Sequence, residues 1–209
     1  MNLYSTESEL KKRLIYPYKW GTKQNDKMDR ETRYIYHIKN FEELISEIDK
    51  RFLEKDNYQL IMNYSLNRWF AFHSAKAVEK IFCSIEGVKA AKDKFDKLVD
   101  FEIQGIRFDH KTSVCPKTRL PLEVLINKKR KIISWLYRNQ SREGRMHFKN
   151  RLFIILYFDG GEHWKLRSEI LWLEEIIKNY MLNFNPENLE EFNINGEQVY
   201  SDIIWAVKK

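Results

Sequence analysis

The run RLFIILYFDGG, residues 151–161, constrains the fold more than any other part of the chain. Every residue from 152 to 158 is aliphatic or aromatic, and two glycines follow at 160 and 161. A short apolar run that ends in glycine is typical of a β-strand buried on both faces. Such a strand needs other strands beside it and helices on its two sides. The run therefore predicts a central mixed β-sheet flanked by helices, an α/β fold.

Helical patterns surround this strand in the sequence. Residues 41–52 carry an amphipathic apolar stripe that begins after Asn40, an N-cap residue whose capping-box partner is Glu43. Further elements are expected as helices over 65–88 (ended by Gly87), 121–140 and 162–182, and as one or two strands over 192–209 around an Asn195-Gly196 turn. With only 7 Gly and 4 Pro in 209 residues, long linkers are not expected, and residues 1–209 are predicted to form a single domain.

Composition limits the classes of protein to which the chain can belong. No run approaches the roughly 18 apolar residues of a membrane span, and the first 20 residues lack an apolar signal core. We therefore expect a cytoplasmic protein without membrane association, whose two cysteines are reduced thiols. The 37 Lys and Arg exceed the 30 Asp and Glu, which gives a net charge of +7. A positive excess of this size fits a nucleic-acid partner.

The stretch VDFEIQGIRFDHKTS, residues 99–113, has the pattern of a β-hairpin. Taking Gln104-Gly105 as its two-residue turn sets the strand register by counting outward. Side chains alternate along a strand, so four apolar residues point to the core: Phe101, Ile103, Ile106 and Phe108. The opposite face carries charged residues: Asp100, Glu102, Arg107, Asp109 and Lys111.

The charged face of this hairpin sets two carboxylates against each other. Asp100 falls opposite Asp109, where Cβ atoms are about 4.5–5.5 Å apart and like charges destabilise the pairing. Such a pair favours a shared proton or a bound cation, and Mg²⁺ prefers oxygen ligands of this kind. Lys111 lies on the same face, about 6–7 Å along the strand from Asp109. The alternative is a solvated outer face without a site.

Glu79 is the candidate for a third acidic ligand. On a helical wheel it borders the apolar stripe of the helix over 65–88, where a carboxylate is costly to desolvate unless it is paired or bound to metal. The alternative is a head group that reaches water. Glu86 competes for the same role, and Asp96 would replace Asp100 in a different hairpin register.

An acidic residue on a helix, an Asp on one strand and Asp-x-Lys on the next resemble the PD-(D/E)xK nuclease superfamily, which has the restriction-endonuclease-like fold. The resemblance implies an αβββαβ core at about residues 66–160, or about half the chain. Its parts would be a helix at 66–85, a strand pair at 98–114, a helix at 122–139 and a strand at 151–158. An N-terminal helical extension and a C-terminal helix plus strand would complete the domain. Two features depart from the family pattern: Val99 stands where the superfamily has proline, and the third strand, near 84–95 or 112–116, is not located.

The resemblance also implies a chemistry. Glu79, Asp100 and Asp109 would bind Mg²⁺ or Mn²⁺, and Lys111 would orient or activate the attacking water and stabilise charge on the phosphate. We therefore expect a metal-dependent nuclease that hydrolyses DNA phosphodiester bonds, of a restriction or mobile-element type. RNA as substrate and a homodimer as active form stay open. The alternatives are a nucleic-acid-binding protein on the same fold with little or no catalysis, and an α/β interaction protein.

The segment 127–151 is expected to contact the nucleic acid. It holds nine Lys or Arg and one acidic residue, Glu143, with aromatic residues such as Trp135 between them. Basic and amide side chains of this kind bind phosphates and base edges. The residues assigned to this role are Lys128, Lys129, Arg130, Arg138, Gln140, Arg142 and Arg145. The alternative is a solvated helix face followed by a surface loop.

Overall fold

The computed structural model describes residues 2–91, 99–118, 120–139, 149–194 and 196–209. The chain divides into two compact units. The first, here called the helical unit, comprises Met1–Ala77 and Arg167–Leu171, and the second, the sheet unit, comprises Val78–Leu166 and Trp172–Lys209. The boundary falls inside one long helix, α4 (Tyr58–Cys83). No helix in the described ranges combines the length and apolar character needed to cross a bilayer.

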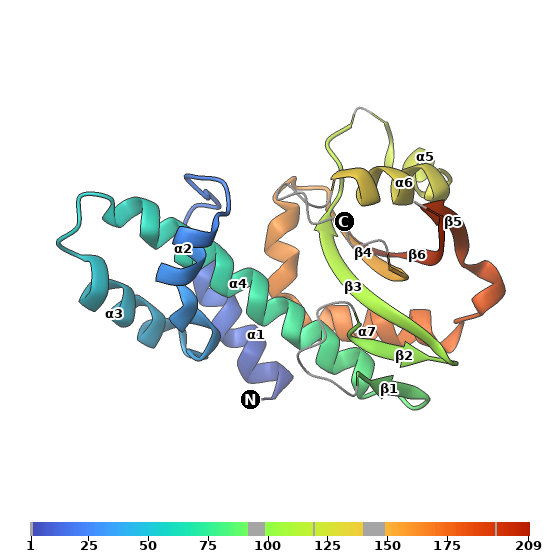
Figure 1. Ribbon diagram of the computed structural model, residues 1–209, viewed down its shortest axis with the longest axis horizontal. Helices are drawn as coiled ribbons and strands as arrows, with labels where there is room; N and C mark the ends of the chain where they lie inside the picture. Colours follow the sequence, from blue (N-terminus) through green and yellow to red (C-terminus); the bar gives the residue numbers. More distant parts are fainter. Residues whose placement is uncertain (1, 92–98, 119, 140–148, 195) are drawn as a thin grey trace. The chain divides into compact units, whose positions relative to one another are not determined.

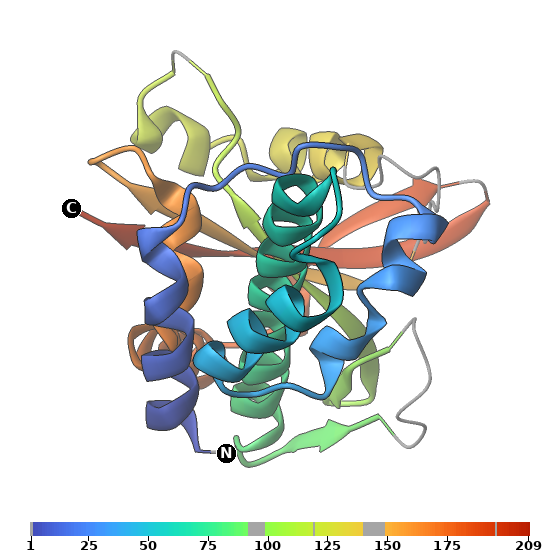
Figure 2. The same cartoon turned by 90° about the vertical axis from the view of Figure 1, so that its left-hand side faces the viewer.

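In the helical unit, α1 and α3 lie beside α4 (Figures 1 and 2). All elements of this unit that precede α4 are shorter than α4. They are α1 (Leu3–Lys12), η1 (Arg13–Ile15), α2 (Asp26–Glu31), η2 (Arg33–Tyr36) and α3 (Phe41–Phe52). Trp69 of α4 meets Phe41 edge-on at 5.6 Å and donates a hydrogen bond to the Ile38 carbonyl at 2.7 Å. The expected cap of α3 is confirmed, because the Asn40 side chain accepts the Glu43 N–H at 3.0 Å.

The sheet unit contains one six-stranded mixed sheet with the order β1-β2-β3-β4-β6-β5. Strand β4 is parallel to both of its neighbours, β3 and β6, whereas the other neighbouring pairs are antiparallel. The strands are β1 (Val88–Ala90), β2 (Phe101–Ile103), β3 (Ile106–Val114), β4 (Arg151–Phe158), β5 (Glu190–Ile194) and β6 (Glu197–Lys208).

Helices lie on both sides of this sheet, α5 (Leu122–Ile126) and α6 (Lys129–Asn139) on one side and α7 (Ile170–Leu182) on the other (Figure 1). On the α6 side, the rings of Tyr137 and Phe153 meet edge-on at 5.4 Å. On the opposite side, Phe82 from the end of α4 stacks on Phe101 at 4.4 Å. The short 3₁₀ helices η3 (His163–Ser168) and η4 (Pro186–Asn188) flank α7 in the chain. These layers position the ends of β2, β3 and β4, where the predicted site residues lie.

The structure confirms the central strand and the mixed α/β class. β4 has the expected bounds, and its residues 152–156 are all fully buried. The strand that the sequence did not locate is β1, which pairs with β2 in antiparallel register. The tail forms both β5 and β6. Gly196 lies in the turn between them with φ +83°, and its neighbour Asn195 lies outside the described residues.

The helices differ from the expectation at their ends. α4 begins seven residues before the expected start, at Tyr58, and it ends at Cys83, where Ser84 Oγ donates to the Ile81 carbonyl at 2.7 Å. The helix expected over 121–140 is two helices, because the Lys128 N–H turns back to the Leu125 carbonyl at 2.8 Å. The first part of the segment 162–182 is the 3₁₀ helix η3. Short-range hydrogen bonds of this kind end or tighten a helix without a glycine or proline signal.

Candidate active site

The β2–β3 hairpin has the register that the sequence predicts. Phe101 pairs with Phe108, Glu102 with Arg107, and Ile103 with Ile106. The turn residues Gln104 and Gly105 have φ of +49° and +83°, as a type I′ turn requires at both of its central positions. Because the register is fixed by this turn, the side chains at 107, 109 and 111 share one face of β3.

Asp100 lies just before β2 and caps the backbone of β3. Its N–H donates to the Phe108 carbonyl at 2.8 Å, and its Oδ2 accepts the His110 backbone N–H, also at 2.8 Å. The same Oδ2 lies 2.6 Å from Nδ1 of the His110 ring. That ring is buried and stacks on Phe101 at 6.1 Å, so His110 packs in the core of the sheet unit. The ring also acts as a polar clamp on Asp100, which sequence reasoning did not anticipate.

The tautomer of His110 follows from its surroundings. Its Nε2 is buried and has no hydrogen-bond partner among the described atoms. A buried N–H donor without an acceptor is costly, whereas Nδ1–H finds an acceptor in Asp100. The proton therefore belongs on Nδ1, and His110 donates both its backbone and its ring N–H to one carboxylate oxygen.

Asp109 forms an ion pair with Arg151, the first residue of β4. The two residues are register partners on the parallel strands β3 and β4, so their side chains leave the same face of the sheet. Arg151 is only 6% exposed, and its guanidinium lies 5.9 Å from the ring centroids of both Tyr137 and Phe153. Arginine at the start of a buried apolar strand is the signal in the sequence that points to this buried cation.

The carboxyl groups of Asp100 and Asp109 lie near enough for each to affect the pKa of the other. Burial opposes ionisation of Asp100, but the hydrogen bonds and the electrostatic attraction of His110 outweigh it and lower the pKa of Asp100 to about 2. Burial raises the pKa of Asp109; Arg151 acts in the opposite direction, and Asp100 adds to the increase. The pKa values of the two neighbouring carboxyl groups are thus shifted in opposite directions.

The other two predicted catalytic residues, Lys111 and Glu79, lie on different elements. Lys111 is exposed, on the same face of β3 as Asp109, and its register partner on β4 is Phe153. Glu79 is half-buried on α4. Over the residues that the structure describes, no three His, Cys, Asp or Glu side chains are grouped as metal ligands. The structure thus brings together Asp100 and Asp109, with Lys111 two residues along the strand.

Two of the cations assigned to nucleic acid are engaged within the sheet unit. Lys129 Nζ lies 3.0 Å from Asp202 Oδ1 and donates to the Asn188 carbonyl at 2.8 Å. Arg130 pairs with Glu190 at 3.0 Å and lies over the Phe192 ring at 4.6 Å. These contacts hold the start of α6 against β5 and β6, at the β5 edge of the sheet. Gln140, Arg142 and Arg145 lie outside the described residues.

The outer face of α6 presents a different set of side chains. Lys131, Trp135 and Arg138 are spaced four and three residues apart, so they lie along one side of the helix, and all three are exposed. Trp135 is 47% exposed, and Arg138 Nη2 donates to Ser134 Oγ at 2.6 Å. Lys128, half-buried, precedes the helix on the same side. We call Lys131, Trp135 and Arg138 the α6 stripe.

Comparisons of the chain with protein-family models, with curated proteins and with solved structures found no match. The site is therefore interpreted from its own residues and geometry.

Proposed function

We propose that the chain is a metal-dependent nuclease whose site is formed by Asp100, Asp109 and Lys111. The observation that carries the proposal is the neighbouring carboxyl pair: Asp100 bonds the backbone of β3 on both sides of Asp109, and the two groups affect each other's pKa. Adjacent buried carboxyl groups are costly to retain unless they share a proton or bind a cation. A lysine on the same face, two residues from Asp109, adds a positive charge that a phosphate could use.

The order of the elements supports this interpretation. The end of α4 is followed by β1, β2 and β3 as an antiparallel meander, then by α5 and α6, and then by β4 parallel to β3. A helix, three strands, a helix and a strand are also the core that the resemblance to the PD-(D/E)xK superfamily implies. Asp100 precedes β2 and Asp109-x-Lys111 lies on β3, the positions that this resemblance assigns to the catalytic residues.

The carboxyl pair suits a divalent cation such as Mg²⁺ or Mn²⁺ in two respects. Both donors are carboxylate oxygens, and burial together with the charge of Asp100 raises the pKa of Asp109, so added positive charge would stabilise its ionised form. The ion would polarise the phosphate and lower the pKa of a bound water. Asp109 already has a cationic partner in Arg151, so a bound metal ion would share the carboxylate with that guanidinium.

Three residues of the chain would position the two carboxylates and bind the phosphate. His110 fixes Asp100 through two donors to one oxygen, and that leaves the second oxygen of the carboxylate for a ligand. Arg151 orients Asp109 from the neighbouring strand β4 and compensates its charge. Lys111 is exposed and would donate to the phosphate as negative charge develops there.

Cleavage assays on three variants test the proposal. Lys111→Ala and Asp100→Asn should abolish Mg²⁺- or Mn²⁺-dependent cleavage of plasmid and single-stranded DNA, because the first removes the cation proposed to act at the phosphate and the second a proposed metal ligand. Glu102→Gln is the matched control: this carboxylate lies on the adjacent strand and pairs with Lys89 at 3.3 Å, so cleavage should persist. Parallel reactions with RNA decide the substrate class. Wild-type activity in Lys111→Ala, with EDTA-sensitive cleavage retained, would refute the assignment.

A second candidate function is nucleic-acid binding without catalysis on the same fold. The observation that favours it is the buried Asp109–Arg151 ion pair, which satisfies a carboxylate without any metal. This function predicts that DNA binds with equal affinity in Mg²⁺ and in EDTA and is never cleaved. The same assays therefore separate the two candidates.

A further inference from the structure

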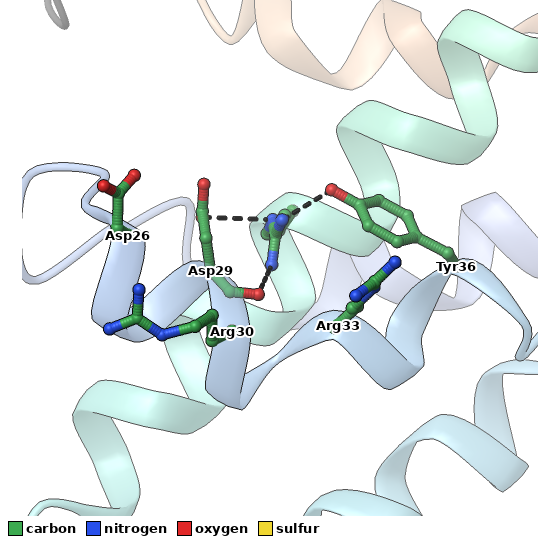
Figure 3. Close-up of a pocket in the computed structure, with 6 residues that line it drawn as sticks. Asp26, Asp29, Arg30, Arg33 and Tyr36 are labelled. Carbon is green, nitrogen blue, oxygen red and sulfur yellow. Dashed lines mark hydrogen bonds and ion pairs between the residues drawn. The ribbon is translucent and has the colours of Figure 1, made fainter. Parts of the chain in front are cut away.

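A small open hollow in the helical unit plays no part in the proposed nuclease chemistry. Its volume is about 240 Å³, below the roughly 300–1,000 Å³ of pockets that hold drug-sized ligands. Figure 3 shows its charged and aromatic lining, which consists of Asp26, Asp29, Arg30, Arg33, Tyr36 and Arg68. We call it the arginine pocket. Its size and polarity suit a small charged group and not an apolar ligand.

Arg68 of α4 forms the fixed wall of the arginine pocket. Its Nη1 donates to the Asp29 carbonyl at 2.6 Å and to Thr32 Oγ1 at 2.8 Å, and its Nη2 donates to the Tyr36 hydroxyl at 2.5 Å. Its Nε lies 3.3 Å from Asp29 Oδ1. Four of the five N–H donors of this guanidinium are thus directed at protein acceptors, and one N–H on Nη2 is left.

The charge of Asp29 is compensated within the protein. Its Oδ1 accepts a hydrogen bond from the Tyr64 hydroxyl at 2.7 Å, in addition to the contact with Arg68. Tyr64 and Arg68 are one turn apart on α4, so they hold Asp29 together from one side of that helix. Asp29 therefore positions Arg68 and leaves the positive charge of the pocket to other residues.

Arg30 and Arg33 supply that remaining charge. Both are exposed, both line the hollow, and within the described part of the chain neither forms an ion pair or a hydrogen bond. Their like charges favour an anion in the hollow, which the Asp26 carboxylate also lines. Arginine is the side chain best suited to bind phosphate oxygens through paired N–H donors. The Tyr36 hydroxyl, which accepts from Arg68, has its own O–H to donate.

We propose that the arginine pocket binds the terminal phosphate of a nucleic-acid strand. A terminal phosphate carries about −1.5 to −2 charges at pH 7 and three acceptor oxygens, which match the donors of Arg30, Arg33, Tyr36 and Arg68. The net charge of +7 favours a polyanionic nucleic acid over a phosphorylated protein. This site does not depend on the carboxyl pair of the sheet unit, so it stands whether or not the chain cleaves nucleic acid.

Fluorescence anisotropy with a 3′-labelled single-stranded oligonucleotide, in EDTA, tests the proposal. The strand is compared with and without a 5′-phosphate, and wild type should bind the phosphorylated form about tenfold more tightly. Arg30→Ala/Arg33→Ala should lose this difference, and Arg30→Lys/Arg33→Lys should keep part of it, because lysine retains the charge without the paired donors. Inorganic phosphate should compete with the phosphorylated strand for wild type only.

Lys23→Ala/Lys27→Ala is the matched control. It removes two exposed charges from the same stretch of chain, neither of which lines the pocket, and it should preserve the tenfold difference. If this variant loses the affinity difference as fully as Arg30→Ala/Arg33→Ala does, the difference arises from general electrostatic attraction, and the proposal is overturned. Equal wild-type affinity for both strands would also overturn it, as would stronger competition by a phosphoserine peptide, which would assign the pocket to a protein partner.

Discussion

The Asp100 side chain links the stability of the sheet unit to pH. Its pKa is lowered to about 2 in the folded chain and is close to 3.8 without that environment, so the carboxylate stabilises the fold above pH 4. That stabilisation is lost as the pH falls through the folded value. We expect Asp100→Asn to lower the free energy of unfolding by about 2 kcal/mol at pH 7, from 1.36 kcal/mol for each pKa unit. The loss of unfolding free energy caused by Asp100→Asn should become smaller as the pH falls toward 2.

Urea unfolding of wild type and Asp100→Asn at pH 7 and at pH 3 measures this difference. Glu102→Gln again serves as the control, because Glu102 forms only an exposed pair with Lys89. A cost for Asp100→Asn that is the same at both pH values would contradict the assigned role of His110 as its partner.

The Asp109–Arg151 pair makes a second prediction at the residue scale. Removing Arg151 leaves a buried carboxylate without its compensating cation, which typically costs about 3–5 kcal/mol. We expect Arg151→Met to destabilise the protein by that amount. The double variant Asp109→Asn/Arg151→Met should recover part of the loss, because it removes the stranded charge as well.

A double-mutant cycle from urea unfolding gives the coupling between these two residues. Strictly additive costs would mean that the ion pair does not contribute to stability as a unit. Nuclease activity of Asp109→Asn in the same preparation reports separately on the proposed metal site.

At the scale of the element, the start of α6 and its outer face have different roles. Lys129 and Arg130 hold the helix start to β5 and β6, whereas the α6 stripe faces solvent. Stacking of one base on an aromatic side chain contributes about 1–3 kcal/mol to single-strand binding. We expect Trp135→Ala to weaken binding of single-stranded DNA by that amount without changing its salt dependence.

Lys131→Ala/Arg138→Ala should have the complementary effect. Each lost phosphate contact lowers the slope of log K against log salt by about 0.7 for a single strand, so the slope should fall by about 1.4. Leu182→Ala removes another exposed apolar side chain, on α7, and should change neither quantity. Titrations by fluorescence anisotropy at several salt concentrations measure both effects, and a change of slope in Trp135→Ala would argue against stacking.

The elements also show how far local sequence patterns carry a prediction. The apolar run of β4, the Gln104-Gly105 turn and the Asn40 cap are encoded within a few residues, and all were predicted correctly. The same turn fixed the register that sets Asp109 and Lys111 on one face. The break between α5 and α6 has no glycine or proline to mark it, so periodicity alone could not reveal it.

The partners of the site residues were the part that sequence could not supply. Arg151 lies 42 positions from Asp109, and only the parallel pairing of β3 with β4 brings them together. Lys129 and Arg130 look like free cations in the sequence until β5 and β6 place Asp202 and Glu190 beside them. The pairing of strands that are distant in the sequence determines these contacts. The pattern of charges along the chain does not show which strands pair.

At the scale of the whole molecule, metal binding should be linked to both proton uptake and thermal stability. The pKa of Asp109 is raised, so below that pKa a cation that binds the carboxyl pair competes with a proton. The apparent affinity for Mn²⁺ should therefore increase with pH, by up to about tenfold per unit while Asp109 is protonated. A ligand that binds only the folded state raises the melting temperature according to its affinity.

Thermal unfolding with and without Mn²⁺ over a series of pH values measures this linkage. The melting-temperature increase should grow with pH in wild type and be absent from Asp109→Asn. An increase of equal size at every pH, or one that persists in Asp109→Asn, would place the ion elsewhere.

The position of β4 between β3 and β6 has a consequence for biosynthesis. β6 leaves the ribosome some 40 residues after β4, so a nascent chain displays one unpaired edge of a strand that is apolar from Leu152 to Phe158. Unpaired apolar edges of this kind recruit other chains and promote aggregation. The protein should therefore depend on chaperones that shield β4 during translation, and slowing synthesis between β4 and β6 should lower its soluble yield.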